Sequence, residues 1–417
     1  MRAIVAIIAA AELIAGSCGA KSSLNVRDFG AVGDGVAKDT SAIQKALDEC
    51  AGGGGGTVLV PDGVYLTGSL VLGRDTTLQF ASRASLVGSP DIADYPLVNI
   101  RWEGEFREGH RALLSASNAA NVKLTGGFIF GPPSPLSHLR NPRGPSLIEL
   151  TGCTNAVLEG FTTQYQQLWS IHLLFCQNLT AQNLTLRTVG ANGDGIDVDS
   201  CDGVTIDRCD INTGDDAISL KSGRGLAAQG LGRPTQNVLI RDCRLHSSIY
   251  AAIGLGTEMS GGIRDVKLQN CVLSGRQNAI FIKSREGRGG FMENISGENL
   301  TILKSPTFIG IDLLKKGIQA TDPVPGEVEK WARVQNFSFK HVRVQDVAEL
   351  VAGINVPTAR PVEGFALADI SGTCSRGISL ANMTNVVLSQ INVTGFAGSL
   401  IKTTNVQGTG LDLSAAK

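Results

Sequence analysis

The sequence predicts an all-β protein, a single-domain right-handed parallel β-helix solenoid with an N-terminal capping helix. Short strand-like segments recur, beginning at residues 121, 155, 178, 203, 237, 265, 294 and 385. Through residue 299 the starts lie 23 to 34 residues apart, and no helical pattern long enough for a βαβ crossover separates them. Glycine is abundant, at 51 of 417 residues, and only 18% of residues are charged. Stacked coils of parallel strands fit these observations best.

The segment 39–53 is the one convincing amphipathic helix in the sequence. Asp39 or Thr40 can cap its first turn, and glycines follow its last turn. Its apolar face is formed by Ile43, Ala46 and Leu47. Because the open end of a solenoid exposes unpaired strand edges, we expect this helix to cover the N-terminal end of the core.

Residues 1–20 have the pattern of a signal peptide, with an early arginine, an apolar run and small residues before a polar segment. The sequence Ala-Gly-Ser-Cys ending at Cys18 offers an alternative, a lipoprotein cleavage site. We therefore expect a secreted or periplasmic protein, or an outer-membrane lipoprotein. No other segment is long and apolar enough to cross a bilayer. The net charge of −1 argues against a nucleic-acid partner.

The chain contains nine cysteines. Five of them fall beside the recurring segments, at Cys153, Cys176, Cys201, Cys243 and Cys271. This placement favours stacked buried thiols over a metal site, while a local disulfide between Cys201 and Cys209 stays open. Several Asn-x-Ser/Thr sequons fall inside the same pattern, and we interpret their asparagines as turn residues and not as glycan sites.

Two adjacent acids, Asp215 and Asp216, lie in the segment NTGDDAISLKSG. Aligning residues 192–200 with 213–222 at an offset of 22 forms inward ladders, Ile196 on Ile218 and Val198 on Leu220. The same offset puts Asp194 over Asp216. Because neighbouring coils lie about 4.8 Å apart, the three carboxylates are predicted to meet in one patch.

Strand parity alone would point Asp194 and Asp216 inward. We expect the neighbouring glycines to permit a turn or bulge that rotates both side chains outward. These glycines are Gly193, Gly195 and Gly214. The patch could be an acidic turn that binds calcium or is simply solvated. No cation is expected at the patch itself, whereas Asp199 has Lys221 one coil away.

Like charges this close raise at least one carboxyl pKa, which leaves one acid protonated while the others stay ionised. A proton donor beside ionised bases is the division of labour that hydrolysis of a glycosidic bond needs. The acid patch therefore favours a catalytic site over a solvated turn.

Eight segments resemble glycoside hydrolase family 28, the polygalacturonases and their relatives. They are DFGAVGDGVAKDTSAIQKAL, GGTVLVPDGVYLTGSL, RWEG, LWSIHLLFCQNLT, NGDGIDVDSC, TGDDAISLKSG, GTEMSGG and IKSREGRGG. The resemblance as a whole runs from about residue 25 to beyond residue 300. The resemblance implies a pectin-lyase-like β-helix and inverting hydrolysis of pectic chains without a metal or cofactor. It also implies that Asp215 is the general acid and that Asp194 and Asp216 activate water.

The sequence departs from that family at the predicted substrate-binding residues Tyr250, Phe281 and Lys283. Polygalacturonases carry a histidine in a Gly-His-Gly turn, and alignment on GTEMSGG places Tyr250 there. Their Arg-Ile-Lys reads Phe-Ile-Lys here. In the stacking scheme Tyr250 lies above Asp215, and Phe281 faces outward above Gly254.

The missing arginine would have held a uronate carboxylate, whereas Phe281 offers an apolar face for stacking on a sugar. We therefore predict that Phe281 sets substrate choice, toward a rhamnose-containing pectic polymer. Lys283 could still bind a carboxylate, or could join the row of Asp199 and Lys221. Arg285 and Arg288 are expected to flank the cleft, where they either attract an acidic polymer or are simply solvated.

These features predict that residues 21–417 form one catalytic domain, a monomer that binds a pectic poly- or oligosaccharide. The substrate is either polygalacturonate or rhamnogalacturonan, with rhamnogalacturonan or a related glycan slightly favoured. Two alternatives stay open. A polysaccharide lyase of the same fold would lose activity with a chelator and release unsaturated products. A non-catalytic carbohydrate-binding β-helix would have no need to tolerate the repulsion among three acids.

Overall fold

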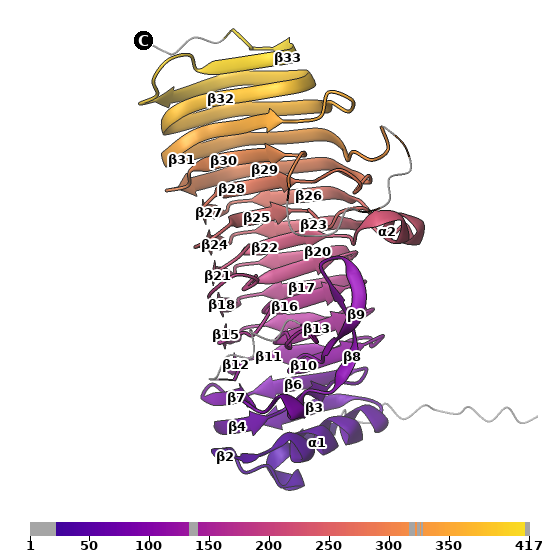
Figure 1. Ribbon diagram of the computed structural model, residues 1–417. Coiled ribbons are helices and arrows are strands. Elements are labelled where there is room, and N and C mark those ends of the chain that lie inside the picture. Colours follow the sequence, from indigo (N-terminus) through magenta and orange to yellow (C-terminus); the bar gives the residue numbers. More distant parts are fainter. Residues whose placement is uncertain (1–21, 133–140, 317–321, 323–325, 327, 413–417) are drawn as a thin grey trace, which may run out of the picture.

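The chain winds into a parallel β-helix, shown in Figure 1 as a tall stack of coils. A computed structural model describes residues 22–132, 141–316, 322, 326 and 328–412. Within them, 31 strands form one continuous sheet system, and the pairings between successive coils are parallel. The predicted all-β solenoid is confirmed. The predicted signal peptide and Cys18 lie outside the described residues.

The N-terminal coils contain, in order, β1 (Ser22–Asn25), η1 (Val26–Phe29), β2 (Asp34–Lys38), α1 (Thr40–Gly52), β3 (Gly56–Val60), β4 (Gly63–Thr67), β5 (Leu70–Val71), β6 (Thr76–Phe80), β7 (Ala84–Gly88), η2 (Ile92–Asp94), β8 (Leu97–Trp102) and β9 (Glu105–His110). The next coils contain β10 (Leu114–Ser117), β11 (Lys123–Thr125), β12 (Phe128–Phe130), β13 (Ile148–Thr151), β14 (Val157–Glu159), β15 (Thr162–Gln164), β16 (Ile171–Leu174), β17 (Gln177–Gln182) and β18 (Thr185–Arg187).

The central coils contain β19 (Ile196–Asp199), β20 (Asp202–Asp207), β21 (Asp210–Thr213), β22 (Ile218–Lys221), α2 (Gly225–Leu231), β23 (Thr235–Arg241), β24 (Arg244–Ser247), β25 (Ala251–Leu255), β26 (Ile263–Gln269), β27 (Val272–Gly275) and β28 (Asn278–Lys283). The last coils contain β29 (Phe291–Leu303), β30 (Thr307–Asp312), β31 (Arg333–Asn355), β32 (Val362–Thr394) and β33 (Ile401–Thr409).

The strand register predicted around the acids is confirmed. Strand β19 pairs with β22 so that Ile196 stands against Ile218 and Val198 against Leu220. The inward ladder continues through β25 and β28, and Phe281 stands against Gly254 as predicted. The ladder residues are fully or almost fully buried. Their stacking fixes which side chains of each coil face outward.

Helix α1 covers the N-terminal end of the stack (Figure 1) and buries the predicted apolar residues together with Cys50. The predicted cap differs in detail. Asp39 makes no side-chain cap, because its carboxylate accepts hydrogen bonds from the backbone N–H groups of Val32 and Gly33. Thr40 Oγ1 accepts a hydrogen bond of 2.9 Å from the Gly68 N–H. Both side chains therefore tie the helix to the first coils.

Asparagines and thiols form ladders between the coils. The sequon asparagines Asn294 and Asn336 adopt a left-handed conformation, each with φ of 58°, and Asn336 Nδ2 donates to Asn294 Oδ1 at 3.1 Å. This confirms that they are turn residues. The eight described cysteines are buried and free, so no Cys201–Cys209 disulfide is present. Stacked thiols are confirmed, because the Cys176 N–H donates to Cys201 Sγ at 3.2 Å.

One hairpin departs from the solenoid pattern. Strands β8 and β9 pair antiparallel and lie along the outside of the stack in Figure 1. Trp102 packs on Trp169 with a distance of 4.8 Å between ring centroids, and Glu105 pairs with Arg224 at 2.8 Å. These contacts anchor the hairpin to the coils that carry the acids.

We predict that Leu245→Ala lowers the free energy of unfolding by about 2–5 kcal/mol, because the truncation leaves a cavity in the ladder. Leu245 is 1% exposed and stacks between Ile211 and Leu273. Val36→Ala is the control, since Val36 is 80% exposed and its truncation should change stability by less than about 0.5 kcal/mol. Denaturant unfolding followed by circular dichroism measures both, and equal effects would contradict the stacked core.

Candidate active site

A cavity of about 450 Å³ opens over the central coils, on the outward side of β19, β22 and β25. It is lined by all three predicted acids and by aromatic, cationic and further polar residues. The lining includes Trp102, Glu103, Trp169, Asn192, Asp194, Asp215, Asp216, Lys221, Tyr250, Glu258, Lys283, Arg285, Lys315 and Lys316. A larger hollow of about 840 Å³ lies elsewhere, along β23, β26, β29 and β31, but no cluster of acids lines it. The chemistry therefore points to the smaller cavity.

The structure brings Asp194, Asp215 and Asp216 together, as the register predicts. Each offers a carboxylate oxygen that lies within 4.8 Å of the other two. Asp215 is the most exposed of the three at 9%, against 4% for Asp194 and 2% for Asp216. Three oxygens at this spacing could also hold a hard cation such as calcium. Lysine side chains, however, already supply positive charge at the cluster.

Backbone donors fix two of the carboxylates. Asp215 accepts hydrogen bonds of 2.9 Å from the Asn192 N–H and from the Asp216 N–H. Asp216 accepts from the Ala251 N–H at 3.1 Å and from Lys283 Nζ at 2.7 Å. These bonds come from four successive coils, those of β19, β22, β25 and β28, so the orientation of the acids depends on the stacking.

Gly254 leaves the space that Asp216 needs. A Cβ at position 254 would approach Asp216 Oδ2 to 2.2 Å, so no larger residue fits there. The glycines beside the acids lie outside β19 and β22, as predicted, and Asp194 and Asp216 line the cavity. Gly193 and Gly214 do not adopt a left-handed conformation. They are needed because a Cβ would collide with the backbone of neighbouring turns, at Gly190 for Gly214 and at Val189 for Gly193.

The expectation that no cation lies at the acid cluster is wrong. Lys221 Nζ lies 2.7 Å from Asp197 Oδ1 and 3.8 Å from Asp194 Oδ2, and Lys283 Nζ lies 2.7 Å from Asp216. The strand register was predicted correctly, but the long lysine side chains reach diagonally across coils to acids other than their register partners. Lys283 therefore joins the acid cluster itself, and Lys221 pairs with Asp197 instead of Asp199.

Burial and mutual repulsion raise the pKa of two of the acids. Burial is the largest cause of the rise at Asp194, and the charges of Asp197 and Asp215 add to it. Burial and the charge of Asp216 raise the pKa of Asp215, while the Asn192 N–H and Lys283 act in the opposite direction. The raised pKa values thus favour one bound proton within the cluster, as the sequence predicts. They do not decide whether Asp194 or Asp215 carries that proton.

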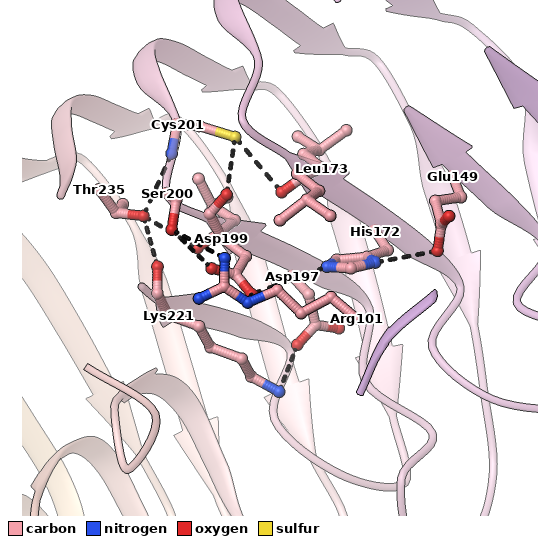
Figure 2. Close-up of polar contacts among 12 residues, drawn as sticks. Arg101, Glu149, His172, Leu173, Asp197, Asp199, Ser200, Cys201, Lys221 and Thr235 are labelled. Atoms are coloured by element: carbon pink, nitrogen blue, oxygen red, sulfur yellow. Dashed lines mark hydrogen bonds and ion pairs between the residues drawn. The ribbon is translucent and has the colours of Figure 1, made fainter. Parts of the chain in front are cut away.

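A layer of buried ion pairs supports the cluster, and Figure 2 shows it. Arg101 Nε from the hairpin lies 3.4 Å from Asp199 Oδ2, and His172 lies 3.1 Å from Glu149 and 4.0 Å from Asp199. Although burial alone lowers the pKa of His172, its contacts with Asp199 and Glu149 raise it to about 9. The imidazole is therefore charged at neutral pH. Burial raises the pKa of Asp199, but the charges of Arg101 and His172 outweigh it and lower that pKa overall.

The three predicted substrate-binding residues have different surroundings. Tyr250 and Lys283 line the cavity. Phe281 is only 6% exposed and is absent from the described lining, because two ammonium groups lie over its ring, Lys283 Nζ at 5.5 Å and Lys315 Nζ at 5.1 Å. Its apolar face is thus occupied, which leaves little room for the stacked sugar proposed from the sequence.

Sequence reasoning missed Lys315 and Lys316, which follow β30. No repeat or motif marks them. Of the two predicted arginines, Arg285 lines the cavity, whereas Arg288 does not. Arg288 is fully buried, pairs with Asp322 and donates to the Thr257 carbonyl, so its role there is structural.

Fold and site together define a parallel β-helix solenoid that carries a cluster of carboxylates in an open cavity. The family model for glycosyl hydrolases family 28 matches residues 50–407. A probable polygalacturonase from Vitis vinifera is 33% identical over 314 residues, which cover 71% of this chain and 64% of the grape protein. This chain belongs to glycosyl hydrolases family 28.

Two solved structures share the fold. The family 28 exopolygalacturonase of Yersinia enterocolitica matches with a TM-score of 0.83 at 22% identity, covering 95% of this chain and 79% of its own. The exopolygalacturonase of Thermotoga maritima matches with a TM-score of 0.74 at 25% identity, covering 88% of this chain and 92% of its own. The chain spans less than two thirds of the length of the grape protein.

We predict that Asp194→Asn stabilises the fold at neutral pH. Because the pKa of Asp194 is raised, its ionised form costs stability above that pKa, and the cost fades as the pH falls toward the ordinary value. Thermal melting from pH 8 to pH 4 should show a higher Tm for the variant, with a difference that shrinks on acidification.

The control is Asp34→Asn, since two backbone N–H groups lower the pKa of Asp34 and its ionised form favours the fold. That variant should show no gain at any pH. A lower Tm for Asp194→Asn than for the wild type at pH 7 would show that the ionised carboxylate of Asp194 does not destabilise the fold.

Proposed function

We propose that this protein is an exported inverting hydrolase that cleaves pectic polysaccharide chains bearing free uronate carboxylates. The convergence of Asp194, Asp215 and Asp216 beside a group of lysines carries the proposal. The signal-peptide pattern of residues 1–20 supports export. No helix among the described residues has the length and apolar character needed to span a membrane.

The charge of the cavity supports an acidic substrate. Lys283, Arg285, Lys315 and Lys316 line the same cavity as the three acids. The named relatives include an exo-poly-alpha-D-galacturonosidase of Dickeya chrysanthemi, 28% identical over 381 residues. Galacturonate occurs in polygalacturonate and, alternating with rhamnose, in rhamnogalacturonan. The surroundings of Phe281 remove the main reason for favouring rhamnogalacturonan, so polygalacturonate is the first candidate.

In the proposed mechanism Asp215 donates its proton to the glycosidic oxygen as the bond to the anomeric carbon breaks. It is the most exposed acid of the three, which suits contact with a leaving group. Asp194 and Asp216 orient a water molecule and accept its proton as its oxygen attacks the anomeric carbon from the opposite face. Lys283 Nζ donates a hydrogen bond of 2.7 Å to Asp216 Oδ2, which places a positive charge beside this carboxylate and fixes its orientation.

The stereochemistry of the product tests inversion directly. The acid oxygens lie within 4.8 Å of one another, which is closer than the roughly 6.5–9.5 Å of typical inverting pairs, so the spacing does not by itself assign inversion. We expect hydrolysis of an α-linked galacturonide to release the β anomer first, as followed by proton NMR. Early release of the α anomer would overturn inversion. Products that absorb in the ultraviolet, with activity lost to a chelator, would favour the lyase alternative instead.

We predict that Asp215→Asn lowers kcat on a pectic oligosaccharide by about 10²–10⁴-fold, the usual contribution of a general acid. An aryl galacturonoside with an acidic phenol needs no proton at its leaving oxygen, so Asp215→Asn should retain much more of its activity there. Asp194→Asn should lose activity on both substrates, because the attacking water still needs a base.

Asp346→Asn serves as the matched control. Asp346 is exposed, lies outside the cavity lining and has φ of 56°, a conformation that asparagine also adopts. It should keep wild-type activity. If Asp194→Asn, and not Asp215→Asn, recovers on the aryl substrate, the two roles are exchanged.

A further inference from the structure

The end of the cavity nearest β28 and β30 gathers cations that the proposed mechanism does not use. Lys315 and Arg285 are half-buried and line the cavity beside Lys283. Their electrostatic situations differ. Lys283 is 8% exposed and is occupied by Asp216 at 2.7 Å. Neither Lys315 nor Arg285 forms a side-chain ion pair with any residue that the structure describes.

Two aromatic rings hold the ammonium groups in place. Lys315 Nζ lies 5.1 Å from the ring centroid of Phe281 and 5.9 Å from that of Tyr250. Lys283 Nζ lies 5.5 Å and 5.2 Å from the same two centroids. Cation–π attraction therefore confines two like charges to the same small region. Their mutual repulsion is relieved when an anion binds between or beside them.

Arg285 adds a donor that lacks a partner. Its Nε is buried and has no hydrogen bond among the described residues. A guanidinium fits a carboxylate with two parallel hydrogen bonds, so an incoming carboxylate would satisfy this group. Burial, together with the charges of Lys283 and Arg285, lowers the pKa of Lys315. A bound anion would offset both effects and stabilise the charged form of Lys315.

We propose that Lys315 and Arg285 form the binding site for a uronate carboxylate of the substrate, next to the acid cluster. The proposal rests on the pectic hydrolase function above and names the residues that determine the specificity of the enzyme for an acidic substrate. Phe281 then acts as a positioning residue that holds Lys315, and does not itself stack on a sugar. The arginine missing at position 281 is replaced in function by Arg285, which follows the end of the same strand β28, and by Lys315 from the segment after β30.

The test uses the full-length Asp215→Asn protein, so that turnover is slow while the substrate binds. A galacturonate oligomer and its fully methyl-esterified counterpart of equal length are titrated by calorimetry. The parent should bind the acidic oligomer more tightly. Adding Lys315→Met, which keeps the length of the side chain, should weaken binding of the acidic oligomer by about 10- to 100-fold, the worth of one charge-assisted contact. Binding of the ester should stay nearly unchanged.

Two further variants sharpen the result. Arg285→Gln should also weaken binding of the acidic oligomer selectively. Lys267→Met is the control, because Lys267 is an exposed lysine that lines the larger hollow and not this cavity. It should alter neither affinity. Added salt should weaken binding of the acidic oligomer to the parent more than to the Lys315→Met variant.

Selective loss on the acidic oligomer supports the proposal. Equal losses on both oligomers, or no loss, would overturn the assignment of Lys315 while leaving the hydrolase function intact. A parent protein that binds neither oligomer, with a wild type that releases no reducing ends from any pectic chain, would instead overturn the proposed function and this site together.

Discussion

The in-register stacking of β19, β22 and β25 is the constraint on which the site depends. The aliphatic ladder fixes the inward side chains, and parallel pairing then fixes the position of every outward residue relative to the next coil. This arrangement brings Asp194 from one coil against Asp215 and Asp216 of the next. A shift of one residue would turn the acids into the core and the aliphatic residues into water. Fold and site are therefore specified by the same pairing.

The second requirement is compensation of charge buried at the cluster. Lys221 and Lys283 contact the acids, while Arg101 and His172 pair with the neighbouring carboxylate of Asp199. Isolated buried carboxylates would be too costly to keep ionised. The compensation is incomplete, since the pKa values of Asp194 and Asp215 stay raised. Because the lysines do not fully neutralise the carboxylates, one carboxyl of the cluster can stay protonated. Acid–base hydrolysis uses such a group as its proton donor.

Much of this could be predicted from the sequence, because it follows from periodicity. The repeat spacing predicted the solenoid, and the 22-residue offset predicted the meeting of the three acids. The direction of long side chains could not be predicted this way. Lys221 and Lys283 reach diagonally to acids outside their own register positions. Lys315 and the β8–β9 hairpin lie outside the repeat pattern, so neither periodicity nor spacing connects them to the site.

The proposed mechanism places cleavage of the glycosidic bond at the acid cluster. A crystal structure of the Asp215→Asn protein with a bound galacturonate oligomer tests this most directly. We predict a glycosidic oxygen within about 2.6–3.2 Å of the residue 215 side chain, with Asp194 and Asp216 facing the adjacent anomeric carbon. An oligomer bound only in the larger hollow along β23, β26, β29 and β31 would contradict the claim.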